Sequence, residues 1–122
     1  MRTPRRATGD AYEDRALRHL QGAGLVLVAR NFNTRHGELD LVMRDGEALV
    51  FVEVRFRQRS GFGNAADSVT PAKQARLVRA AGLFLQAHPR LAHRPCRFDV
   101  LAFDAATEGA RCNWLRAAFE AQ

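Results

Sequence analysis

The chain has 122 residues, and 47% of them are hydrophobic, which is enough to form one domain with a core of its own. Charged residues make up 26%, a share that excludes a low-complexity disordered chain, and the apolar runs are too short to cross a bilayer. The formal net charge is +6, and every basic residue except Lys73 is an arginine.

This positive charge favours polyanions as partners, because a basic surface releases the counterions condensed on them. Arginine suits phosphate in particular, since its planar guanidinium group bonds two oxygens at once. The base composition of a genome would produce the same arginine-rich and alanine-rich chain. Charge therefore makes nucleic acid a candidate partner without deciding the matter.

Residues 1–9 are predicted to be a basic flexible tail, and residues 10–122 to form a single domain. The first predicted element of that domain is a helix over residues 10–21. Asp10 is a candidate N-cap, and Glu13 three residues later completes a capping-box pattern. Leu17 and Leu20 lie on the same helix face as Glu13. The tail lacks the apolar core of a secretion signal, which predicts a cytoplasmic protein that does not enter a membrane.

Three strands follow, one over residues 25–32 and two within GELDLVMRDGEALVFVEVRFR (residues 37–57), where Asp45-Gly46 is typical of a type I′ hairpin turn. Thr70 as the cap and Pro71 as the first residue predict a second helix. We expect its apolar stripe to contain Ala75, Val78, Ala81 and Leu85.

A further strand is predicted over residues 96–103, and residues 110–119 form either a strand or a helix. The order α-β-β-β-α-β predicts an α+β domain with a central mixed sheet flanked by helices.

The hairpin contains carboxylates where strands disfavour them. If Asp45 and Gly46 form the loop, Asp40 pairs with Phe51, Glu38 with Glu53 and His36 with Arg55. All six side chains then share one face, with Asp40 and Glu53 diagonal to each other at roughly 7–8 Å. Like charges this close are destabilising, so a divalent cation or Arg55 must offset them.

A solvent-facing salt bridge between Glu53 and Arg55 is the structural alternative to a functional site. The apolar residues 49–52 instead indicate partial burial, and a partly buried carboxylate pair favours a functional role. Glu13 has two possible roles: it caps the first helix, or it belongs to the cluster of carboxylates with Asp40 and Glu53. Lys73 and Gln74 are either solvated residues or, with the free N–H groups of the helix start, a phosphate site.

Together the hairpin sequence, FGNAADSVTPAKQARL and RFDVLAF resemble the YraN family of small uncharacterised bacterial proteins over nearly the whole chain. That resemblance implies a restriction-endonuclease-like core, similar to PD-(D/E)XK nucleases and archaeal Holliday-junction resolvases. In those enzymes a helix glutamate, a strand aspartate and an acid-x-lysine motif bind Mg²⁺ or Mn²⁺ and activate water.

By this resemblance Glu13 matches the helix glutamate, Asp40 the metal-binding aspartate and Glu53 the acid of the acid-x-lysine motif. Lys73 and Gln74 lie near the basic residue of the following helix. Position 55 departs from the pattern, because Arg55 stands where lysine is expected. Arginine keeps the positive charge that stabilises a transition state, but it does not readily release a proton.

Three functions follow as hypotheses. The first is a metal-dependent endonuclease acting on branched or structured DNA, with DNA favoured over RNA. Its catalytic residues would be Glu13, Asp40, Glu53 and Arg55. The residues that contact the substrate would be Arg57, Arg59, Lys73 and Gln74. Two incisions in a junction would call for a homodimer. The second is a non-catalytic nucleic-acid-binding module with a nuclease fold. The third is an assembly subunit that binds through Trp114, Leu115 and Phe119, although we expect these three side chains to seal the core instead.

Overall fold

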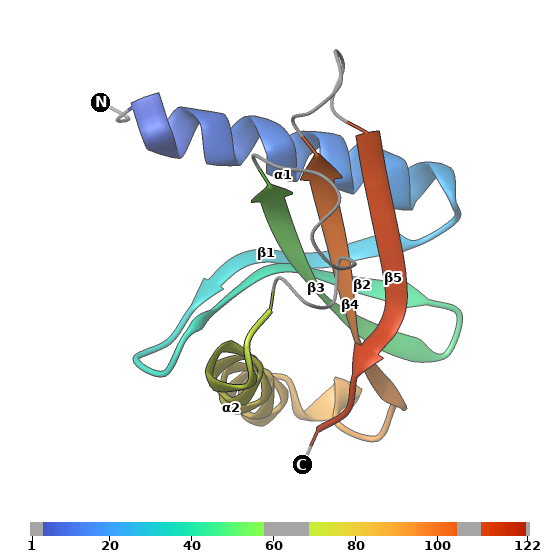
Figure 1. Cartoon of the computed structure of the whole chain (residues 1–122). Helices are drawn as coiled ribbons and strands as arrows, with labels where there is room; N and C mark the ends of the chain where they lie inside the picture. Colours follow the sequence, from blue (N-terminus) through green and yellow to red (C-terminus); the bar gives the residue numbers. More distant parts are fainter. Residues whose placement is uncertain (1–3, 58–68, 105–110, 122) are drawn as a thin grey trace.

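The computed structural model of the chain describes residues 4–57, 69–104 and 111–121; the side chains of residues 4–9, 57 and 111 lie outside this description. The described residues form two long helices and five strands (Figure 1). In chain order the elements are α1 (Pro4–Gly22), β1 (Val26–Asn33), β2 (Glu38–Asp45), β3 (Ala48–Arg57), α2 (Pro71–Ala87), a short 3-10 helix η2 (Pro89–Leu91), β4 (Cys96–Asp104) and β5 (Arg111–Phe119).

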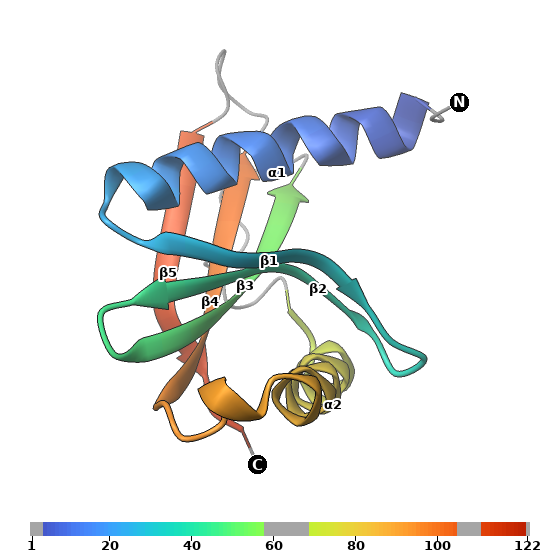
Figure 2. The same cartoon turned by 180° about the vertical axis from the view of Figure 1, so that it is seen from behind.

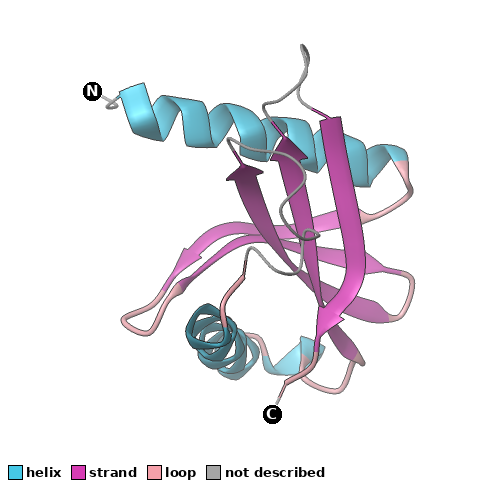
Figure 3. Ribbon diagram, viewed as in Figure 1, coloured by secondary structure: helices cyan, strands magenta, loops and turns pink. Residues whose placement is uncertain are grey.

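The five strands form one sheet in the order β1-β2-β3-β4-β5. Neighbouring strands are antiparallel except β3 and β4, which run parallel. The α+β class, the mixed sheet and the predicted order are therefore confirmed, and Figure 3 shows that the C-terminal segment is a strand rather than a helix. Among the described residues, no helix combines the length and the apolar character needed to cross a membrane.

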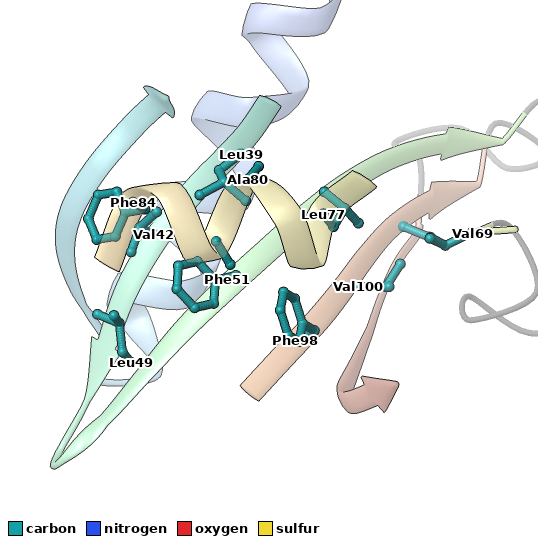
Figure 4. Close-up of a cluster of buried hydrophobic side chains, with 12 residues drawn as sticks. Leu39, Val42, Leu49, Phe51, Val69, Leu77, Ala80, Phe84, Phe98 and Val100 are labelled. Carbon is teal, nitrogen blue, oxygen red and sulfur yellow. The ribbon is translucent and has the colours of Figure 1, made fainter. Parts of the chain in front are cut away.

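The two long helices lie on opposite faces of the sheet (Figure 2). The face beneath α1 buries Ala16 and Leu20 of the helix against a set of strand residues: Leu41, Met43, Val50, Val52, Leu101 and Phe103. The other face packs against α2 (Figure 4), through residues that include Leu39, Val42, Phe51, Phe84, Phe98 and Val100. Trp114, Leu115 and Phe119 pack against these two cores, so the core position expected for them is confirmed.

The second helix begins as predicted. Pro71 occupies its first turn, and the Thr70 hydroxyl oxygen accepts a hydrogen bond from the backbone N–H of Lys73 at 3.2 Å. Of the predicted apolar stripe only Ala81 is confirmed as buried; the other buried residues of the helix are Leu77, Ala80 and Phe84. Val78 and Leu85 are only partly buried, and Ala75 is exposed.

The start of α1 was also predicted wrongly. The helix begins at Pro4, which suits a first helical turn, so Asp10 and Glu13 lie inside it and do not form a capping box. The part of the predicted tail from Pro4 onward is helical. Between Pro4 and Asp10 the only residue that strongly disfavours a helix is Gly9, and this single glycine does not interrupt it.

The hairpin register differs from the prediction by two residues. Asp45 pairs with Ala48 and Leu41 with Val52, so Gly46 and Glu47 form the turn. Gly46 has a left-handed backbone at φ 58° but Glu47 does not, so the predicted type I′ turn, which needs positive φ at both residues, was wrong. The expected pairing of Asp40 with Phe51 was therefore wrong, since Phe51 pairs with Val42. Because a shift of two residues preserves the faces of a strand, Asp40 stays near Glu53.

The β1–β2 ribbon is bent along its length (Figure 1). Leu39 and Leu41 are two residues apart, yet they join the cores on opposite faces of the sheet, which breaks the alternation of a regular strand. On β1 the facing residue Asn31 has φ 56°, a left-handed conformation that asparagine tolerates. The bend thus places Asp40 between the helix α1 and the face covered by α2.

Candidate functional site

The central feature of the site is a pair of carboxylates on neighbouring strands. Glu53 of β3 is only 4% exposed although it lies in an otherwise apolar strand. The ladder between β2 and β3 is recorded as far as Leu41 and Val52, and one more step of that register sets Asp40 opposite Glu53. Where β2 bends away, Asp40 Oδ2 accepts a hydrogen bond from the backbone N–H of Val54 at 2.9 Å.

The environment disfavours the charged form of Asp40. Burial, followed by the negative charge of Glu53, raises the pKa of Asp40 to about 8, against the lowering effect of the Val54 N–H bond. At neutral pH Asp40 therefore keeps its proton unless a cation neutralises the site.

Two cations contact the second acid of the pair. Lys73 Nζ from the first turn of α2 lies 3.6 Å from Glu53 Oε2, and Arg55 Nη1 lies 3.7 Å from the same oxygen. The Lys73 and Arg55 side chains are 35% and 39% exposed, which lets them reach a ligand as well. Within the described part of the chain, the buried Nε of Arg55 has no hydrogen-bond partner.

Glu13 of α1 lies close enough to Asp40 for their charges to interact. Burial and the charge of Asp40 raise the pKa of Glu13, while a hydrogen bond from Arg30 lowers it. Arg30 Nε donates to Glu13 Oε1 at 3.4 Å, and Arg30 Nη1 pairs with Asp14 Oδ1 at 2.7 Å. Glu13 is thus bound by Arg30 and is also subject to the negative charge of Asp40.

The acid pair opens into a cavity of about 600 Å³ between the β1–β2 turn and α2. Its lining is mostly polar and consists of Asn33, Thr34, Arg35, His36, Gly37, Glu38, Asp40, Glu53, Val54, Arg55, Lys73 and Arg76. His36, predicted to pair with Arg55, lies instead in the turn before β2. A cavity with carboxylates and arginines in its wall can accept a metal ion, a phosphate group or both.

Several residues predicted to contact a substrate lie away from this cavity or outside the description. The side-chain amide of Gln74 donates to the backbone oxygen of Val69 at 3.1 Å, and Gln74 lines a different cavity with Arg79 and Glu120. Arg57 is the last residue of β3 and its side chain is not described, while Arg59 lies outside the described residues.

The predicted metal set of Asp40, Glu53 and Glu13 is only partly assembled. Within residues 4–57, 69–104 and 111–121, no three histidine, cysteine, aspartate or glutamate side chains are grouped closely enough to hold a metal ion. Asp40 and Glu53 form the close pair, and Glu13 is a more distant neighbour.

Sequence reasoning missed a second buried acid, Asp99 of β4, which is 0% exposed. Its carboxylate accepts hydrogen bonds from Arg97 Nε at 3.1 Å, from Trp114 Nε1 at 3.0 Å and from the backbone N–H of Ala117 at 2.9 Å. The signal available was an aspartate inside the apolar strand CRFDVLAF. Its partners on β5 were not predictable while that segment was open between strand and helix.

The fold and the site together define an α+β protein in which a mixed sheet holds a buried carboxylate pair beside two cations. The family model described as uncharacterised protein family UPF0102 matches residues 12–103, which contain Glu13, Asp40, Glu53, Arg55 and Lys73. The chain belongs to this family, and the predicted resemblance to the YraN family is confirmed.

Relatives described as UPF0102 proteins match nearly the whole chain. One from Stutzerimonas stutzeri is 52% identical over 114 residues, covering 93% of this chain and 95% of the relative. One from Alkalilimnicola ehrlichii is 54% identical over 118 residues, covering 97% and 90%. One from Bordetella avium is 56% identical over 117 residues, covering 96% of this chain and 77% of the relative.

Proposed function

We propose that this protein is a divalent-metal-dependent DNA endonuclease that acts in the cytoplasm on branched or structured DNA. The observation that carries the proposal is the buried pair Asp40–Glu53, which faces a polar cavity next to Arg55 and Lys73. Its resemblance to PD-(D/E)XK nucleases supplies the reaction type, and the net charge of +6 agrees with a polyanionic substrate.

The residues present fit a hard divalent cation. Asp40 and Glu53 are two carboxylates held together at a cost that burial increases, and a cation between them would remove that cost. These two side chains would hold Mg²⁺ or Mn²⁺, and Glu13, which is bound by Arg30, would assist directly or through a water molecule. A metal bound there lowers the pKa of a coordinated water and neutralises charge on the scissile phosphate.

The cations beside Glu53 have separate parts in this proposal. Arg55 stabilises the negative charge that develops on the phosphate. Lys73 brings an ammonium group to within 3.6 Å of Glu53 from α2, so the site contains a lysine although position 55 does not. Both side chains also orient Glu53, whose Oε2 atom they share.

The test is a cleavage assay on single-stranded, duplex, flap and four-way-junction DNA with Mg²⁺, Mn²⁺ or EDTA. We expect metal-dependent cleavage by the natural protein and its loss in both Asp40→Ala and Glu53→Ala, with DNA binding retained. The matched control is Glu47→Ala in the turn of the same hairpin, where the side chain is 92% exposed and the same charge is removed. Thermal unfolding with and without Mn²⁺ reads metal binding independently, and the two variants should lose the stabilisation.

A second function has a specific observation in its favour. Arg55 and Lys73 already pair with Glu53, and arginine stands in place of the motif lysine, which suits a nucleic-acid-binding module without catalysis. Salt-sensitive DNA binding with no cleavage and no stabilisation by Mn²⁺ would replace the endonuclease proposal with this one. Sedimentation of the protein with junction DNA would show in either case whether a homodimer forms.

A further inference from the structure

A set of basic residues on the wall of the same cavity takes no part in the proposed cleavage reaction. Arg35 and His36 lie in the turn between β1 and β2, and Arg76 lies on α2, one turn after Lys73. All three are exposed. Neither Arg35 nor Arg76 forms an ion pair with the described residues, whereas Arg30, Arg94 and Arg97 each have a carboxylate partner.

The turn that presents Arg35 is fixed by its own hydrogen bonds. The Thr34 hydroxyl donates to the backbone oxygen of Gly37 at 2.7 Å and accepts from the N–H groups of His36 and Gly37 at 3.1 Å each. The Thr34 N–H also donates to the Gly37 oxygen at 2.9 Å. The turn therefore holds its shape before any ligand arrives, which lowers the entropy cost of binding.

The turn is also packed against α2. A Cβ atom on Gly37 would lie 3.2 Å from both Cβ and the backbone oxygen of Arg76, closer than an ordinary contact. Glycine at position 37 is thus what allows the turn and the helix to approach. This approach brings Arg35 and Arg76, which are 41 positions apart in sequence, to the wall of one cavity.

We infer that the turn at residues 34–37 and Arg76 form a phosphate-binding wall that holds the sugar–phosphate backbone of DNA beside the Asp40–Glu53 pair. The inference rests on the proposed function and deepens it by naming where the flanking phosphates lie. The acids on the floor repel phosphate, so a backbone is held near them only if cations on the wall oppose that repulsion. Two guanidinium groups that have no carboxylate partner among the described residues, one on a fixed turn and one on a helix, meet this requirement.

The test compares two double variants of equal charge. Arg35→Ala with Arg76→Ala removes the wall, and Arg44→Ala with Arg79→Ala is the matched control, since Arg44 lies on β2 and Arg79 on α2 and both are exposed outside this cavity. Binding of a short fluorescent DNA duplex is measured by anisotropy in EDTA over a series of NaCl concentrations. Circular dichroism confirms that both variants fold.

We expect the wall variant to bind at least about 10-fold more weakly and its salt dependence, the slope of log K against log salt, to fall by about 2, because each lost phosphate contact removes about 0.9. The control pair should change affinity by less than about 3-fold. Equal losses in the two variants would overturn the inference, since they would mean that only overall charge matters.

Two further arms separate the possible failures. Thermal unfolding with inorganic phosphate distinguishes a free phosphate site from a DNA wall: stabilisation lost in the wall variant with unchanged DNA binding overturns the inference. If the natural protein cleaves DNA and the wall variant binds and cleaves equally well, the proposed function stands and the wall is wrong. If the natural protein neither binds nor cleaves DNA, the proposed function and the phosphate-binding wall are both wrong, and the wall and control variants will not differ from it.

Discussion

Two buried acid sites on the same sheet have opposite chemical environments. Asp99 of β4 accepts hydrogen bonds from one side chain on its own strand and from two groups of β5. Its partner Arg97 is in turn bound to Asp45 Oδ2 at 3.0 Å. At the other site, Asp40 receives one backbone N–H bond and faces the acid Glu53, and the cations present contact Glu53.

The difference separates a structural acid from one available to a ligand. A buried carboxylate with a full set of hydrogen-bond donors fixes the conformation of the chain around it. Asp99 does this for the irregular part of β5, where Ala117 has φ 50°. Asp40 receives a single hydrogen bond while the nearby cations contact Glu53, so its burial beside another acid is only partly offset and is retained at the expense of stability. Only the second kind gains from a metal ion, so we place the function at Asp40 and Glu53.

The largest effect that would test this comparison is the loss of Asp99. Asp99→Ala should destabilise the protein by about 3 kcal/mol or more, because Arg97, Trp114 Nε1 and the Ala117 N–H all lose a buried partner. Urea unfolding followed by circular dichroism measures the change. The control Asp45→Ala, which removes a partly exposed partner of the same Arg97, should cost less than about 1 kcal/mol. Similar effects of the two changes would contradict a structural role specific to Asp99.

Asp40→Asn should stabilise the folded protein rather than destabilise it, by an amount that depends on pH. The folded protein raises the pKa of Asp40 from 3.8 to about 8, so between these values it binds a proton that the unfolded chain releases. The stability of the natural protein should therefore fall as pH rises through this range.

Asparagine keeps an oxygen for the Val54 N–H and does not ionise, so in EDTA the variant should be the more stable protein at pH 8–9, by about 2 kcal/mol. Thermal and urea unfolding across pH 4–9 measure the difference. Added Mn²⁺ should reverse the order by stabilising only the natural protein. A variant less stable than the natural protein at pH 8–9 would show that Asp40 is compensated as Asp99 is.

The smallest expected effect concerns the helix start that positions Lys73. Thr70→Ala removes the hydroxyl that accepts the Lys73 N–H bond and should cost about 1 kcal/mol. Thr70→Ser retains the hydroxyl and serves as the control, with a change within about 0.5 kcal/mol. If the alanine variant also weakens Mn²⁺ binding while Thr70→Ser does not, the start of α2 supports the acid pair; unchanged metal binding would limit Thr70 to capping the helix.

The hairpin shows how a local error can leave a conclusion intact. The Asp45-Gly46 dipeptide indicated a turn, but the strands close around Gly46 and Glu47, so each pairing moved by two residues. Because side chains alternate with a period of two, the acids remained neighbours. The start of α1 was a different error, since a capping-box pattern at Asp10 and Glu13 was outweighed by helical residues that extend back to Pro4.

By itself, the sequence determined the α+β class, the order of the elements, the start of α2 at Thr70 and the proximity of Asp40 to Glu53. These follow from periodicity, capping and alternation, which act over a few residues at a time. Only the tertiary structure decided how β1 and β2 bend at Asn31 and Asp40, which groups satisfy Asp99, and how Gly37 lets Arg35 and Arg76 share a cavity. Such features depend on contacts between residues distant in the chain, and local pattern carries no information about which of those contacts form.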